Sequence, residues 1–282
     1  TEGAAEEALE KMLPSKNLFS PTSGGLMLTP SQDSVLGIYQ ATKWGQKKPG
    51  VYEEAEALRL LKNGKLKSYD VISVKGRKKP TTAGRLLINT TLPASVKDDE
   101  ELLYDPKFRM AKGGMKRFAT RVARSDPEEF SAMIDGWKEL GFNLSFKNGS
   151  SFSLNDFHDG RTIRNNVLKK YKKEEETIRK SRLSRTKKDE KIIALYQKAN
   201  KELERVGRAA YENKDNRMWE WAKSGARGNW SQFGQLVMGP MLVQDPSKKF
   251  VPVPLTTSFG EGLPVSQYWA SLHGARKGTL DR

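Results

Sequence analysis

Residues 191–210, KIIALYQKANKELERVGRAA, carry the pattern that decides the fold of the second half of the chain. The apolar side chains on this stretch recur at Ile192, Tyr196, Ala199, Leu203, Val206 and Ala210. An alternation of four and three residues is the seam of a helix that packs lengthwise on another helix. A similar apolar pattern precedes it, at Val167, Tyr171 and Ile178. Because the polar run 181–188 separates the two patterns, we predict an antiparallel helical hairpin over about residues 160–212.

The predicted hairpin is strongly basic. Residues 160–212 hold 17 Lys and Arg against 8 Asp and Glu, and the whole chain of 282 residues holds 50 against 34, a net charge of +16. Such an excess favours a polyanionic partner, with nucleic acid ahead of an anionic membrane surface. Two alternatives stay open: an acidic neighbouring subunit, and a hairpin whose lysines only keep a solvent-exposed helix pair soluble.

Several protein classes are excluded by composition. The chain has no cysteine, which removes disulfide scaffolds, thiol nucleophiles and Cys-ligated metals, and its two histidines, His158 and His273, exclude a His-rich metal site. No apolar run approaches the ~18 residues of a membrane helix. The acidic opening, which starts at Thr1, has no apolar leader, so we expect a cytoplasmic protein that is a processed chain, an excised segment or one piece of a longer polypeptide.

The remainder of the chain predicts a mixed α and β structure, so the fold class is α+β. Apolar periodicity predicts helices over residues 6–12, 53–61, 114–124 and 128–140, and one from near Pro264. Extended segments are predicted at 26–28 and 70–74, and a polar linker at 97–101. Gly141 is predicted to end the helix before it. The six tryptophans, five of them after residue 130, suggest burial against other parts of the chain.

The turn Asn155-Asp-Phe-His-Asp-Gly160 permits two interpretations. Asp156 and Asp159 could hold Mg²⁺ while His158 acts as a general base, which would make the chain a Mg²⁺-dependent phosphohydrolase. A turn that leads into a helix selects Asp, Asn and Gly in any case, for capping and for left-handed backbone. Since two carboxylates are too few for a firm metal site, the capping interpretation is favoured.

Two Gly-flanked arginines are candidates for phosphate contact. In Ser224-Gly-Ala-Arg-Gly228, glycines let the backbone approach a ligand while Arg227 offers a bidentate guanidinium. His273-Gly-Ala-Arg-Lys-Gly278 repeats this chemistry inside a helical pattern that its glycines weaken. The alternatives are a turn with a surface arginine and a frayed basic C-terminus. P-loop and GxGxxG motifs are absent from the sequence.

Taken in order, five motifs resemble the middle of the β′ (largest) subunit of bacterial-type, multi-subunit DNA-directed RNA polymerase. Residues 12–21 and 29–39 are similar to the family's NILSPANG…PSQDVVLGLYY, and 53–64 to its EEA…A…NG helix. Residues 81–93 resemble TTVGR…LP, and 224–236 resemble SGARGSAAQIRQL. Residues 257–278 resemble ANFREGL..LQYF.STHGARKG. The likeness spans nearly the whole chain and is weakest over 96–150 and the hairpin.

The resemblance implies a division of the chain into three regions. Residues 1–135 would be the pore region that follows the catalytic loop, and 136–235 the funnel domain through which NTPs enter, with the hairpin as its rim helices. Residues 236–282 would be a loop and the N-terminal half of the bridge helix. By motif, Arg227 corresponds to an arginine that contacts the NTP triphosphate. The bridge-helix positions are His273, Arg276 and Lys277.

The activity that the resemblance implies is template-directed RNA synthesis by a complex. Its partners would be a β-like subunit, the remaining β′ segments, template DNA, RNA and NTPs, with no membrane. The family's NADFDGD loop, whose aspartates hold the catalytic Mg²⁺, should precede residue 1, so no catalytic or metal residue is expected here and the chain alone should be inactive.

Short departures from the family motifs suggest a phage-encoded enzyme, in the host cytoplasm or the virion. Gly260 replaces an arginine, Asn229 replaces a serine, and residues 279–282 differ from LADTA. The alternative from another class is a non-catalytic nucleic-acid-binding protein that uses the basic hairpin.

Overall fold

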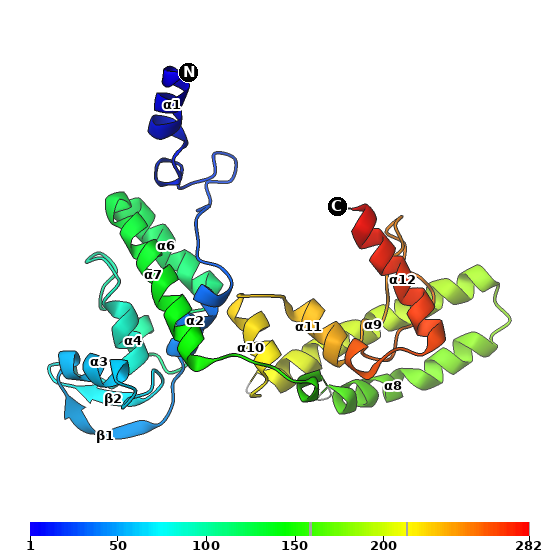
Figure 1. Ribbon diagram of the computed structural model, residues 1–282. Coiled ribbons are helices and arrows are strands. Elements are labelled where there is room, and N and C mark those ends of the chain that lie inside the picture. Colours follow the sequence, from blue (N-terminus) through cyan, green and yellow to red (C-terminus); the bar gives the residue numbers. More distant parts are fainter. Residues whose placement is uncertain (158–159, 213, 282) are drawn as a thin grey trace. The chain divides into compact units, whose positions relative to one another are not determined.

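The computed structural model describes residues 1–157, 160–212 and 214–281 (Figure 1). The described chain is mainly helical and contains one small sheet, which confirms the α+β class. It divides into two compact units, and each is described by itself. The first unit comprises Thr1–Ser150 with Lys223–Arg227, and the second comprises Ser151–Ala222 with Gly228–Arg282.

The helices and strands of the described chain have the following bounds. The longer helices are α2 (Asp33–Ala41), α3 (Glu54–Lys62), α4 (Ala83–Asn89), α6 (Lys112–Ser125), α7 (Pro127–Asn148), α8 (Arg161–Lys180), α9 (Arg185–Tyr211), α10 (Arg217–Ser224), α11 (Trp230–Val237) and α12 (Val265–Leu280). The short ones are α1 (Glu2–Glu7), η1 (Ala8–Met12), η2 (Pro14–Lys16), α5 (Glu100–Tyr104), η3 (Leu154–Phe157) and η4 (Phe259–Glu261). The strands are β1 (Lys47–Tyr52), β2 (Val71–Val74) and β3 (Thr81–Thr82).

The sheet of the first unit lies against α3 and α4. Its order is β1-β2-β3, with β1 parallel to β2 and β3 antiparallel to β2. The strand predicted at 70–74 is confirmed as β2, whose residues are mostly buried. A core of apolar side chains joins the sheet to the helices: Ala57, Leu66, Ile72, Val74, Ala83, Leu86 and Leu103.

Two glycines let α2 and α7 cross in direct backbone contact. A Cβ at Gly37 would lie 2.0 Å from the Gly141 carbonyl oxygen, and one at Gly141 would lie 2.1 Å from the Ser34 carbonyl oxygen. The prediction that Gly141 ends its helix is therefore wrong, because α7 continues to Asn148. Gly141 is present for the close helix packing and not for a C-terminal stop.

Other predicted boundaries in the first unit also need correction. The helix predicted at 6–12 is α1 followed by the π-helical η1, and the linker predicted at 97–101 overlaps α5, which Asp99 caps. The extended segment at 26–28 forms only an isolated bridge between Phe19 and Leu26. The helices predicted at 53–61 and 114–124 are confirmed as α3 and α6 within two residues.

The predicted hairpin is confirmed in the second unit as α8 and α9, which lie side by side in Figure 1. Ile192, Tyr196, Ala199 and Leu203 are buried along the seam, together with Val167 of α8. Ala210, however, is exposed and Tyr211 is fully buried in its place. The shift occurs because an α-helix repeats every 3.6 residues and drifts from a strict heptad.

An aromatic cluster fills the base of the hairpin. Trp219 and Trp230 meet edge to face, with ring centroids 5.1 Å apart. The ring centroids of Phe233 and Tyr211 are 4.9 Å apart, also edge to face. The predicted burial is confirmed for these two tryptophans and for Trp137. It is wrong for Trp269 on α12, whose exposed fraction is 66%. The helices α10 and α11, which hold much of the cluster, were not predicted.

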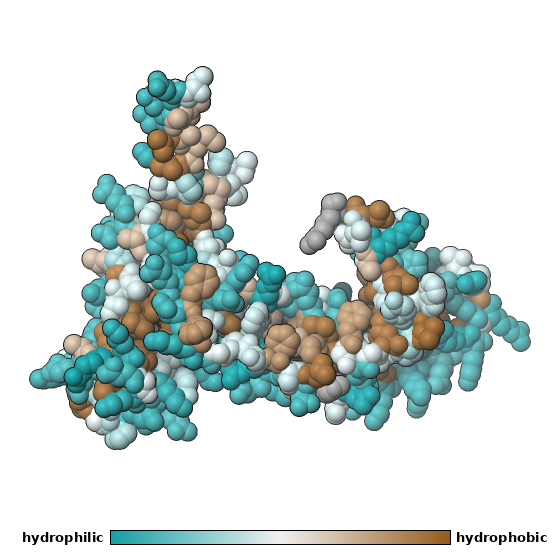
Figure 2. All heavy atoms as spheres, in the orientation of Figure 1, coloured by the Kyte–Doolittle hydropathy of each residue, from teal (hydrophilic) through white to brown (hydrophobic). Residues whose placement is uncertain are grey.

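The surface of the hairpin is polar. In Figure 2, hydrophilic residues cover the visible sides of α8 and α9 and the turn between them. Within residues 1–157, 160–212 and 214–281, no helix is both long and apolar enough to cross a bilayer.

Candidate functional site

Arg227 lies in a turn that glycines shape on both sides. Gly225 and Gly228 adopt φ angles of +76° and +73°, in the left-handed region that favours glycine. Ser224 before the turn is fully buried, and its Oγ accepts a hydrogen bond from the Ala226 backbone N–H at 3.3 Å. The Arg227 side chain itself is exposed and has no hydrogen bond or ion pair with any residue that the structure describes. Its guanidinium is therefore available for an outside anion.

Asn229 begins the helix that follows this turn. Its side-chain oxygen accepts a hydrogen bond from the Gln232 backbone N–H at 3.0 Å, which caps the N-terminus of α11. Asparagine and serine are equally good caps, so the departure from the family's serine preserves the local structure.

The predicted bridge-helix residues lie on α12, a helix with little packing of its own. Among its residues, all of which the structure describes, only Ala270 is buried. The side chains of His273 and Arg276 are exposed and have no hydrogen bond or ion pair within the described part of the chain. Lys277 differs, because its Nζ pairs with the Asp281 carboxylate one turn further on. Two of the three candidates are thus available to another molecule.

A capping box in η4 fixes the turn before α12. The Glu261 backbone N–H donates to Ser258 Oγ at 3.3 Å, and the Glu261 carboxylate accepts from the Ser258 N–H and Oγ at 3.2 and 2.8 Å. The same carboxylate also binds Arg161 and Arg164 at the start of α8. Burial alone would raise the pKa of Glu261, but the hydrogen bonds, above all those from Arg164 and Ser258, lower it to about 2.

Gly260 of this turn is explained by its neighbours. A Cβ at Gly260 would lie 2.5 Å from Phe157 Cβ and 2.8 Å from the Leu236 carbonyl oxygen. The family's arginine at this position would collide with both. Glycine at this position therefore allows the turn to pack directly on η3 and on the end of α11.

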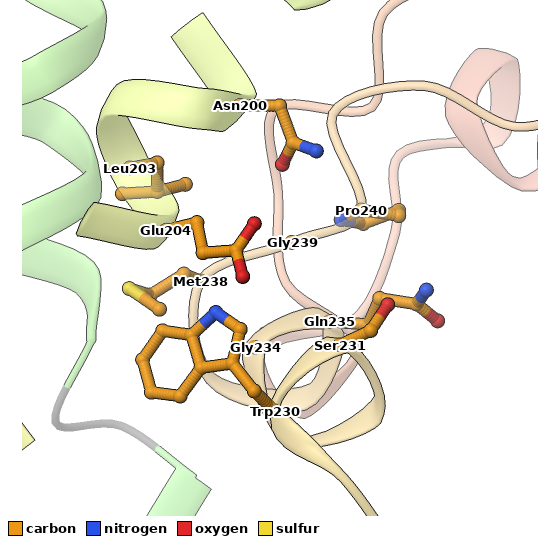
Figure 3. Close-up of a pocket in the computed structure, with 10 residues that line it drawn as sticks. All are labelled: Asn200, Leu203, Glu204, Trp230, Ser231, Gly234, Gln235, Met238, Gly239 and Pro240. Atoms are coloured by element: carbon orange, nitrogen blue, oxygen red, sulfur yellow. The ribbon is translucent and has the colours of Figure 1, made fainter. Parts of the chain in front are cut away.

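Neither of two cavities resembles a nucleotide site. The pocket in Figure 3 lies between α9, α11 and residues 238–240, and its volume is about 70 Å³. Ligand pockets for drug-sized molecules are usually about 300–1,000 Å³. A groove of about 380 Å³ in the first unit has Lys138 as the only cation in its lining, and Lys138 pairs with Asp135. Neither pocket is lined by Arg227, His273, Arg276 or Lys277.

In the alternative metal site, Asp156 stabilises a turn. Asp156 accepts hydrogen bonds from the Ser153 N–H at 2.6 Å and from its Oγ at 3.3 Å, the pattern of a turn-stabilising aspartate. His158 and Asp159 lie outside the described residues. Among the residues described, no three His, Asp or Glu side chains converge as metal ligands.

Comparison with known proteins identifies the family. The model of "RNA polymerase Rpb1, domain 3" matches residues 17–157, which is half of the chain. The chain belongs to this RNA polymerase family. The matched range includes the residues of the α2–α7 crossing and of the sheet.

Curated relatives extend the similarity over 99% of the chain. "DNA-directed RNA polymerase subunit beta'" of Rubrobacter xylanophilus is 30% identical, and the chain covers 23% of it. The proteins of the same name from Desulforamulus reducens and Salinispora tropica are 31% and 28% identical, with 24% and 23% covered. The chain therefore spans about a quarter of the length of the curated relatives that it matches.

The ion pair between Arg164 and Glu261 was not predicted from the sequence. The Ser258-x-x-Glu261 spacing is a capping-box signal and could have identified Glu261. Nothing in the sequence indicated Arg164, which is 97 residues away from Glu261.

Proposed function

We propose that this chain is a segment of the catalytic β′ subunit of a multi-subunit DNA-directed RNA polymerase. In this proposal α8 and α9 form part of the NTP-entry funnel, Arg227 contacts the NTP triphosphate, and α12 is the first half of the bridge helix. The observation that supports the proposal is the similarity to beta' subunits over 99% of the chain, since that range includes the residues of α8, α9 and α12 and Arg227.

The electrostatics of the described residues support this role. Arg227 is exposed without an intramolecular partner, and a planar guanidinium can bind two phosphate oxygens at once. Transfer of a nucleotidyl group spreads negative charge over phosphate oxygens, and a fixed cation beside them lowers the barrier. The net charge of +16 would also draw NTPs and nucleic acid toward the assembled enzyme.

The proposal assigns Mg²⁺ to residues outside this chain. The described residues offer no cluster of three acidic or histidine ligands, so they do not fit the catalytic metal. The partners would be a β-like subunit, the remaining β′ segments, template DNA, RNA and NTPs. The chain without these partners is proposed to be inactive. A cytoplasmic location and a phage origin remain predictions.

The test replaces Arg227 in the assembled polymerase. Arg227→Ala should raise the KM for NTP or lower the elongation rate by more than about tenfold, because a charge-assisted phosphate contact is lost. Arg59→Ala is the matched control, since Arg59 is another exposed arginine of the first unit and its side chain has no hydrogen bond or ion pair with the described residues. An Arg227→Ala enzyme with unchanged KM and rate would remove Arg227 from the active site.

The alternative, a non-catalytic protein that binds nucleic acid through the hairpin, is less favoured. It accounts for the charge of α8 and α9 but not for the similarity of the remaining chain to beta' subunits. Its distinguishing property would be DNA binding by the isolated chain that depends on the cations of the hairpin.

A further inference from the structure

We infer that Arg164 is a positioning residue, which holds the turn before α12 through Glu261 and thereby fixes where α12 begins. The inference concerns a contact between the base of the α8–α9 hairpin and η4, both within the second unit. Its bearing on RNA synthesis rests on the proposed function, whereas the anchoring itself does not.

The contact is bidentate and buried. Arg164 donates from Nη1 to Glu261 Oε2 and from Nη2 to Glu261 Oε1, the second at 3.3 Å. Both side chains are only 6% exposed. Arg164 Nη2 also donates to Asn165 Oδ1 at 3.0 Å, which orients the guanidinium. Removing one member of a buried ion pair leaves the other charge without its partner, and this is strongly unfavourable.

Glu261 lies at the point where three parts of the second unit meet. Its carboxylate faces the first turn of α8, where Arg161 provides a second, more exposed cation. A carboxylate at a helix N-terminus also interacts favourably with the helix dipole. Its own turn packs on Phe157 and Leu236 through Gly260. The turn is therefore held on several sides.

The start of α12 is tied to the same turn. The Gln267 side-chain oxygen accepts from the Thr257 N–H and Oγ1 at 3.1 and 2.9 Å, and its Nε2 donates to Thr256 Oγ1 at 3.2 Å. Beyond Ala270 the helix is mostly exposed. A helix that is held at one end takes its direction from that end, so loss of the Arg164–Glu261 pair should loosen all of α12.

The first experiment measures amide hydrogen exchange in the 282-residue chain. Arg164→Met keeps most of the side-chain volume but not the charge, and Arg164→Lys keeps the charge. We expect Arg164→Met to speed exchange in residues 265–272 by at least about tenfold and to leave residues 192–203 of α9 within about twofold. Arg164→Lys should recover part of the protection. Arg185→Ala, an exposed cation at the start of α9, is the matched control and should change neither segment.

The outcomes separate anchoring from simple packing. If the side chain only fills space, Arg164→Met will protect α12 as well as or better than Arg164→Lys, and the inference is wrong. If Arg164→Met fails to fold, Glu261→Gln provides the same test with a nearly isosteric side chain. Unchanged exchange in residues 265–272 of a folded Glu261→Gln chain overturns the inference as well.

The second experiment uses the assembled polymerase. Arg164→Met should lower the maximal elongation rate by about tenfold and leave the KM for NTP within about twofold, because Arg164 acts on α12 and not on the phosphate contact proposed for Arg227. Arg164→Lys should restore part of the rate. A changed KM with an unchanged rate would contradict the positioning role. A wild-type assembly without activity would contradict the proposed function alone, since the exchange measurement reports the anchor independently.

Discussion

Gly37 and Gly141 set the distance between α2 and α7, and a single methyl group should disrupt it. We predict that Gly141→Ala destabilises the first unit by about 3 kcal/mol or more, because its Cβ would lie 2.1 Å from the Ser34 carbonyl oxygen, a backbone atom that cannot turn aside. Urea unfolding of the chain measures the effect. Gly136→Ala on the same helix is the control: its Cβ would lie 3.9 Å from Thr91 Cβ. That change should stabilise by up to about 1 kcal/mol through helix propensity.

Glu261 should make part of the stability dependent on pH. Its pKa in the folded chain is about 2, below the ordinary value of 4.5, so the ionised carboxylate is bound more favourably in the folded state. The stabilisation is therefore complete above about pH 5 and is lost as the pH falls from 4.5 toward 2.

We predict that Glu261→Gln lowers the free energy of unfolding by at most about 3 kcal/mol at pH 7, and that the difference from the wild type shrinks as the solution is acidified. Urea unfolding between pH 3.5 and 7 measures it. Glu56→Gln, at an exposed position of α3, is the control and should show a difference below about 0.5 kcal/mol at pH 7. A Glu261→Gln difference that is constant with pH would mean that the carboxylate charge does not matter.

At the scale of elements, two tyrosine hydroxyls form hydrogen bonds between the helices of the hairpin, one from α8 to α9 and one from α9 to α8. Tyr171 of α8 donates to Glu202 of α9 at 2.7 Å, and Tyr196 of α9 donates to Glu175 of α8 at 2.7 Å. The bond to Glu202, with burial, raises the pKa of Tyr171 to about 12. Burial, together with Glu175, raises the pKa of Tyr196 still further. Both phenols therefore stay protonated and keep donating at neutral pH.

We predict that Tyr196→Phe destabilises the second unit by about 1–2 kcal/mol, because the part-buried hydrogen bond to Glu175 is lost, and that Tyr171→Phe destabilises it by less. The more exposed environment of Tyr171 explains the order. Thermal unfolding followed by circular dichroism at 222 nm measures both changes. Tyr268→Phe is the control, since that side chain is exposed on α12 and its hydroxyl has no hydrogen bond with the described residues. If all three changes lowered the unfolding temperature equally, the hydrogen bonds between α8 and α9 would be excluded as a source of stability.

The elements that the sequence predicted well are those with long, regular patterns. The hairpin was predictable because two apolar stripes and a polar run between them leave few alternatives. The length of α7 was not, since Gly141 signals a helix end locally, whereas in the fold it allows the close contact with Ser34 and the helix continues to Asn148. The short helices α10 and α11 were missed because eight residues carry too little periodicity. The candidate residues Arg227, His273 and Arg276 came from Gly-flanked basic motifs and from the family resemblance, whereas the Arg164–Glu261 pair needed the folded structure.

At the scale of the whole molecule, the net charge of +16 is compatible with both candidate functions, a nucleic-acid-binding protein and a segment of a polymerase. The two functions differ in where they place the cations that bind DNA. A dedicated nucleic-acid-binding protein concentrates its contacts on one surface. A segment of a larger enzyme carries cations that are arranged for the assembled cleft. Both bind DNA by counterion release, so binding alone does not separate them. The two kinds of protein are separated by which residues contribute the binding energy.

We therefore predict that the isolated chain binds duplex DNA with a Kd weaker than about 10⁻⁶ M near physiological salt, and that two triple variants weaken this binding equally. Arg182, Arg185 and Lys187 are exposed at the turn of the hairpin, and Arg59, Lys62 and Lys65 are exposed in the first unit. Replacing either set by alanine lowers the net charge from +16 to +13. Non-specific attraction depends mainly on that total, so fluorescence anisotropy titrations should give affinities within about threefold of each other. A hairpin variant that binds more than about tenfold more weakly than its charge-matched control would identify the hairpin as a nucleic-acid surface in its own right.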